Sequence, residues 1–99
     1  MNEQVAAEIA EEYLSRWRRV AVYDELVVME ENGDKDWANV TGEDGTVYKI
    51  LAYVLPEADR ALRLVIAVND RVPRATGAPV TRTAVMRPDG TYTGNQERS

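Results

Sequence analysis

The chain has 99 residues, of which 44% are hydrophobic and 29% are charged, and its formal net charge is −5. Such a length and composition predict one soluble globular domain, residues 1–99, with no apolar run long enough to span a membrane. The sequence contains no cysteine and no histidine. Disulfides, thiolate chemistry, imidazole general bases and most transition-metal sites are therefore excluded, and we expect no cofactor, no metal and no catalytic residues.

Charge is divided unevenly along the chain. Residues 1–59 hold 14 acidic and 5 basic residues, whereas residues 60–99 hold 3 acidic and 7 basic residues. The two parts should attract each other, and the overall acidity argues against binding to nucleic acid. The N-terminal residues are acidic, with Glu8, Glu11 and Glu12, and lack the basic and apolar regions of a secretory signal. We expect a cytoplasmic protein that does not bind membranes.

An amphipathic helix is predicted over residues 3–19. Val5, Ile9, Tyr13 and Trp17 recur at four-residue spacing, which places them on one helix face, and Asn2 is a suitable N-cap. The pattern leaves open whether the helix ends at residue 19 or continues to residue 23.

Strands are predicted at residues 20–29, 46–55, 61–69 and 80–87 from runs rich in β-branched residues or from alternation of apolar and polar residues. The first of these contains Asp24-Glu25, which indicates a bend, and residues 37–41 are a further strand candidate. Short turns at residues 42–45 and 56–60 favour antiparallel pairing. Residues 70–79 are expected to form a loop, and the polar residues from about 93 a frayed tail.

These elements predict an α+β fold in which one N-terminal helix packs on one face of an antiparallel sheet of four strands, or five if residues 37–41 form one. The helix should cover the more apolar sheet face, which carries Ile50, Val54, Leu62, Leu64, Ile66 and Val68.

Candidate metal and catalytic groups lack the spacing that their chemistry needs. Asn32, Asp34, Asp36 and Glu43 match four ligand positions of a calcium loop, but Trp37 stands where that loop needs glycine. The neighbouring carboxylates at 24–25 and 30–31 lie in or next to a predicted strand, where adjacent side chains point to opposite faces and need not share a site.

The strand at residues 46–55 is apolar on both faces, although one helix covers only one. We therefore expect a homodimer formed through the second face, with charged residues at its rim and Val85 as a further candidate member. The expected interface residues are Val47, Lys49, Leu51, Tyr53, Leu55, Arg63 and Val65. Two other interpretations remain: this face is one wall of a ligand cavity, or the loop at residues 70–79 covers it.

The functional hypothesis is a non-catalytic binding or self-associating domain. The order of elements is also compatible with small folds of NTF2-like or cystatin-like shape, which predicts a small-molecule pocket as an alternative. A third hypothesis is an acidic inhibitor or immunity-type protein that binds a basic protein target. No residue motif ties the chain to a family.

Overall fold

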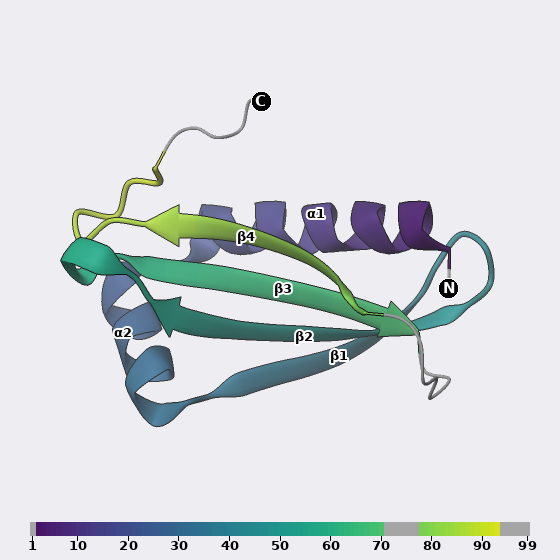
Figure 1. Cartoon of the computed structure of the whole chain (residues 1–99), viewed down its shortest axis with the longest axis horizontal. Helices are drawn as coiled ribbons and strands as arrows, with labels where there is room; N and C mark the ends of the chain where they lie inside the picture. The colour runs from purple at the N-terminus through teal and green to yellow at the C-terminus, as the bar shows by residue number, and fades with distance from the viewer. Residues whose placement is uncertain (1, 71–77, 94–99) are drawn as a thin grey trace.

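The computed structural model describes residues 2–70 and 78–93, which form two helices and a four-stranded antiparallel sheet (Figure 1). The predicted α+β class is confirmed. The expected loop at 70–79 and the tail from about 93 fall almost entirely outside the described residues. In chain order the elements are α1 (Glu3–Val20), α2 (Tyr23–Asn32), β1 (Lys35–Thr41), β2 (Val47–Pro56), the 3-10 turn η1 (Ala58–Arg60), β3 (Leu62–Asp70) and β4 (Val80–Met86).

Helix α1 begins where its sequence predicts. The side chain of Asn2 accepts hydrogen bonds from the backbone N–H groups of Gln4 and Val5, both at 3.1 Å, and so satisfies two donors of the first turn. Ala6 and Ala10 are completely buried, and these small side chains let the helix approach the sheet closely. The helix ends at Val20, one residue beyond the earlier of its two predicted ends.

The strand predicted at residues 20–29 is wrong. Val20 closes α1, Val22 is an extended residue between the helices, and a second helix begins at Tyr23. The β-branched residues misled the prediction because burial, not intrinsic propensity, decides the structure here: Leu26 is 2% exposed and packs in the core from a helix.

Helix α2 carries favourable signals at both ends. Its first turn holds Asp24 and Glu25, whose charges suit the positive end of the helix dipole. Gly33 ends the helix in the left-handed conformation at φ 66°. Its backbone N–H donates to the carbonyl of Glu30, and the backbone N–H of Asp34 donates to the carbonyl of Met29. This pair of bonds is a Schellman motif, which favours glycine at that position.

The sheet is a simple meander in the order β1-β2-β3-β4, with every neighbouring pair antiparallel. Four strands were expected, and the structure has four, but β1 is formed by the further candidate at residues 37–41, extended to Lys35, and not by the segment at residues 20–29. The pairing aligns Trp37 with Leu51, Leu51 with Ala67, and Tyr53 with Val65.

One sheet face and both helices form the core. Helix α1 runs along β3 and β4, and α2 packs near β2, so both cover the same face (Figure 1). No helix within residues 2–70 and 78–93 is long and apolar enough to cross a membrane. The six core residues expected from the sequence are all buried, and the core also includes Val5, Ala6, Ala10, Leu14, Leu26, Tyr48 and Met86.

Candidate functional site

The sheet face that the helices leave uncovered, called the open face here, is the candidate binding surface. Strand alternation and the observed register bring all seven residues of the predicted interface onto it, together with Val85. The register also places Ala67 on this face, as strand alternation predicts, and adds residues that the sequence interpretation did not include: Lys35, Trp37, Asn39, Thr41, Asn69, Thr81 and Thr83.

Exposure varies strongly among the apolar residues of the open face. Val65 is buried by its neighbours, at 2% exposed, and Leu51, Tyr53 and Val47 are half-buried. Leu55 is 43% exposed, and Trp37 is 60% exposed. The greatest apolar exposure on this face therefore lies over β1 and β2, with the tryptophan as its largest member.

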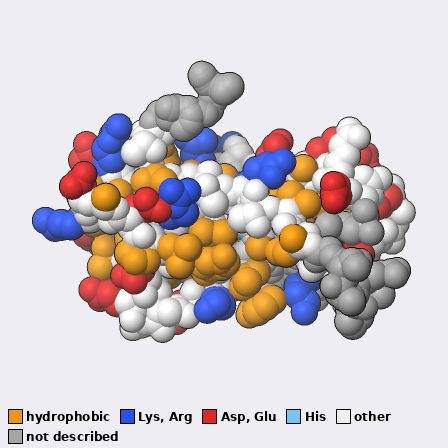
Figure 2. All heavy atoms as spheres, in the orientation of Figure 1, with side chains coloured by type: hydrophobic (Ala, Val, Ile, Leu, Met, Phe, Trp, Pro, Cys, Tyr) orange, Lys and Arg blue, Asp and Glu red, His pale blue; other side chains and the backbone are white. Residues whose placement is uncertain are grey.

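The face has an apolar centre and polar ends. Its middle rows hold Trp37, Leu51, Ala67, Tyr53 and Val65, with threonines on β4. One end is the polar row of Asn39, Lys49 and Asn69, and the other end carries Arg63. Figure 2 shows hydrophobic side chains gathered across the middle of the side facing the viewer, with both basic and acidic side chains around them.

Cations dominate the charge of the open face. Lys49 lies over the ring of Trp37 with 5.2 Å between its ammonium nitrogen and the ring centroid, and Lys35 lies 6.0 Å from the ring centre of Tyr53. Such contacts favour a lysine beside an aromatic ring but are weak at exposed sites. Arg63 donates to Glu57 and, at 3.0 Å, to the hydroxyl of Thr83. The open face is therefore apolar and mildly basic although the whole chain is acidic.

The β1–β2 hairpin fixes which residues reach the open face. The carboxylate of Asp44 accepts hydrogen bonds from the Thr46 N–H, at 3.1 Å, and from the Tyr48 hydroxyl, at 2.7 Å. The bond from Tyr48 lowers the pKa of Asp44, while desolvation by burial raises the pKa of Tyr48. Because Tyr48 is anchored in the core, the residues on either side of it must point to the open face.

The structure separates the residues of the calcium-loop pattern. Asn32 ends α2, Asp36 lies in β1, and Glu43 lies in the hairpin beyond the far end of β1. Asp36 lies five residues before Thr41, the last residue of β1, which is a span of roughly 17 Å at about 3.3 Å per residue, and Glu43 lies beyond that end. In the described part of the chain, no three or more acidic side chains are grouped so that they could hold a metal ion.

Two arginines of the basic C-terminal part have partners within the fold, and the paired carboxylates at residues 24–25 and 30–31 lie on a helix. Arg82 pairs with Glu11 at 3.2 Å, which joins the basic C-terminal part to α1, and Arg87 donates to Thr91. Arg71 and Arg74 lie outside the described residues. The carboxylate pairs at 24–25 and 30–31 belong to α2 and not to a strand, so the strand alternation invoked for them does not apply.

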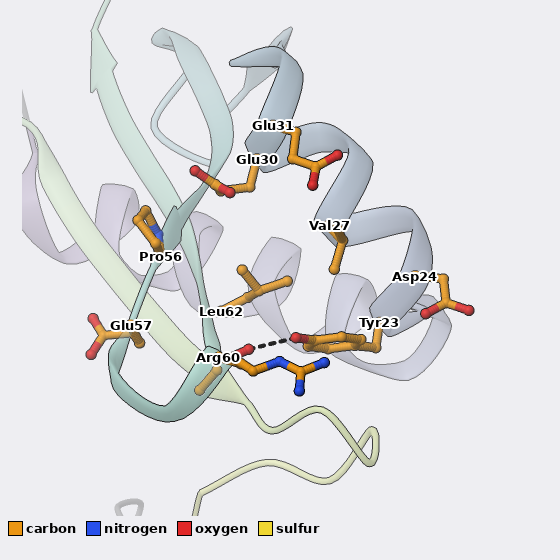
Figure 3. Close-up of a pocket in the computed structure, with 10 residues that line it drawn as sticks. Tyr23, Asp24, Val27, Glu30, Glu31, Pro56, Glu57, Arg60 and Leu62 are labelled. Atoms are coloured by element: carbon orange, nitrogen blue, oxygen red, sulfur yellow. Dashed lines mark hydrogen bonds between the residues drawn. The ribbon is translucent and has the colours of Figure 1, made fainter.

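A groove of about 590 Å³ lies on a different part of the molecule, between α2 and the turn that joins β2 to β3 (Figure 3). Val27 and Leu62 contribute apolar side chains from its two walls. The hydroxyl of Tyr23 donates to the carbonyl of Arg60 at 2.5 Å, which ties the start of the helix to the turn. The groove also has four carboxylates among its lining residues: Asp24, Glu30, Glu31 and Glu57.

The turn beside this groove has an unusual backbone. Asp59 and Arg60 both have positive φ, at 59° and 66°, and the Ala61 N–H donates to the carbonyl of Ala58. Two successive left-handed residues are the geometry of a type I′ turn, in which glycine is preferred at the position of Arg60. Because Arg60 has a Cβ, its conformation is costly.

Comparisons with protein-family models, with curated proteins and with solved structures found no match. The molecule is thus defined by its architecture: a domain of two helices on one face of an antiparallel meander, whose other face is covered by no helix or strand of residues 2–70 and 78–93. Its surfaces are the only basis for a functional assignment.

Proposed function

We propose that the protein is a non-catalytic, self-associating domain that forms a homodimer by packing the open faces of two copies together. The observation that supports this most is the apolar centre of that face, with Trp37 60% exposed and Leu55 43% exposed beside Leu51 and Tyr53. Surface of this kind is unfavourable in water, and a second copy related by two-fold symmetry is a common way to cover it. We place the domain in the cytoplasm, with which a cysteine-free chain is compatible.

The size of the face sets the expected strength of the dimer. Four strands about 4.8 Å apart and about 25–30 Å long give a face of roughly 500–600 Å² per copy. This is at the small end of specific interfaces, which bury about 800 Å² per partner on average. We therefore expect a reversible dimer with a dissociation constant on the order of micromolar.

The uncharged middle of the open face supports a second copy as the occupant, whereas the cations at its edges oppose one another unless Glu57 pairs with them. The part of the centre on β2 and β3 carries no charge, and the lysines beside it, Lys35 and Lys49, are exposed, so two copies can meet there while both ammonium groups stay near water. A two-fold axis across the middle of the strands brings the Lys49 end of one copy over the Arg63 end of the other. Glu57, which binds Arg63, lies at that end and would then face a cation of the second copy.

Light scattering after size exclusion tests this proposal. The native chain should show a mass that rises from monomer toward dimer between about 1 and about 300 μM, as a micromolar constant requires. Leu51→Asp places a charge in the apolar centre and should leave a folded monomer, with an unchanged circular dichroism spectrum. A native chain that is monomeric throughout this range contradicts the proposal.

A further inference from the structure

Two of the four negative charges of helix α2 are unfavourable for the helix itself. The helix spans ten residues, contains four carboxylates and no basic residue, and places Glu30 and Glu31 in its last turn. Negative charge is unfavourable there, because the last turn is the negative end of the helix dipole. Local stability would favour a lysine or arginine at these positions. Departures of this kind from local rules are expected where a surface serves another purpose.

Three of the four carboxylates of α2, those of Asp24, Glu30 and Glu31, border a groove and have no cationic partner within the described chain. The ion pairs between described residues join Glu12 to Arg16, Glu57 to Arg63 and Glu11 to Arg82. Asp24, Glu30 and Glu31 take part in none of them. Arg60 is the single cation among the ten residues that line the groove, and it lies on the exposed turn.

The shape of the groove favours a long side chain with a charged end. Val27 and Leu62 provide apolar walls, and the carboxylates of Glu30 and Glu31 lie above them on α2 (Figure 3). Arginine and lysine bury an aliphatic stem against such surface while the charged head stays near water. Arginine fits best, because its planar head donates two hydrogen bonds to one carboxylate.

We propose that this groove binds a basic segment of another protein, with an arginine side chain laid between α2 and the β2–β3 turn. The occupant follows from charge complementarity: Asp24, Glu30 and Glu31 have no cationic partner among the described residues and line a groove of about 590 Å³, a volume sufficient for one long side chain and its neighbours. Glu57, the partner of Arg63, is shared with the edge of the open face, but Asp24, Glu30 and Glu31 lie on α2, so the proposal does not depend on the homodimer.

Amide chemical shifts of the native protein test it, with acetyl-Arg-Leu-Arg-Leu-Arg-amide as the probe. Titration to about 1 mM should shift the amides of Tyr23, Val27 and Leu62, and the shifts should weaken when salt rises, as for an exposed ionic contact. The charge-reversed peptide acetyl-Glu-Leu-Glu-Leu-Glu-amide should leave these amides unchanged.

A pair of matched variants identifies the carboxylates. Glu30→Gln/Glu31→Gln should weaken binding of the basic peptide about fivefold or more, since two exposed ionic contacts are lost. Both substitutions remove charge that opposes the helix dipole, so the variant should remain folded. Glu8→Gln/Glu25→Gln removes the same charge outside the groove and should change the affinity less than about twofold.

Four results overturn the proposal. They are an absence of shifts at about 1 mM peptide, equal binding of the acidic peptide, equal loss in both double variants, and shifts confined to the open face. None of them bears on self-association, which is measured without peptide.

Discussion

Replacing Trp37 with glutamate should abolish the proposed dimer without unfolding the monomer. The side chain is 60% exposed, which for a tryptophan of up to about 250 Å² leaves about 150 Å² available to a partner. If half of that area is buried on association, each copy contributes about 2 kcal/mol, and the two copies of a symmetric dimer about 4 kcal/mol. The dissociation constant should rise about a thousandfold.

Sedimentation velocity at several concentrations measures this change. Val28→Glu is the matched control, because Val28 is also an exposed apolar residue, at 52%, but lies on α2 and not on the open face. The control should dimerise like the native chain, while Trp37→Glu stays monomeric at about 300 μM. Native-like dimerisation of Trp37→Glu, or equal weakening by Val28→Glu, would refute the reasoning.

Three further predictions concern the turns. Tyr48→Phe should lower the urea midpoint at pH 7, because the variant loses the hydrogen bond to Asp44. The difference in urea midpoint between the variant and the native chain should shrink below pH 3.8, because the lowered pKa of Asp44 gives stability that is lost as this carboxyl is protonated. A difference in midpoint that does not change with pH contradicts this. Arg60→Gly should raise the free energy of unfolding by about 1 kcal/mol by relieving a positive φ, whereas a loss of stability in urea would show that the arginine side chain matters more. Gly42→Ala should lower the free energy of unfolding by about 1–3 kcal/mol, because an added Cβ would lie 2.8 Å from side-chain atoms of Tyr48 and Val5. An unchanged melting temperature would show that these two side chains move aside easily.

Much of the fold follows from the sequence because the signals are periodic. The apolar spacing and the Asn2 cap predict α1, and the alternation over residues 62–68 predicts the central strand β3. Helix α2 was missed because its β-branched residues resemble a strand. Two signals favoured a helix: acidic residues at its start, around Asp24, and a glycine at its end, Gly33. The sequence interpretation assigned the first to a bend and the second to a turn.

The open face was predictable on β2 and β3 but not on β1. The expected hairpin turn at residues 42–45 would pair residue 41 with residue 46, whereas the structure pairs Thr41 with Val47. A shift of one residue moves every side chain of β1 to the opposite face. Trp37 could therefore not be assigned to the interface until the register was known. The register goes with side-chain contacts inside the hairpin, such as the hydrogen bond from Tyr48 to Asp44, which the apolar pattern does not reveal.

Intermolecular contacts provide the most direct test of self-association through the open face. An isotope-filtered NOE experiment on an equal mixture of labelled and unlabelled chains, at about 1 mM, detects only protons of different copies that lie within about 5 Å, a distance typical of side chains packed across an interface. The account predicts contacts from the Trp37 ring and from the Leu51 methyl groups of one copy to the open face of the other. An absence of such contacts, or contacts made only by α1 and α2, would contradict it.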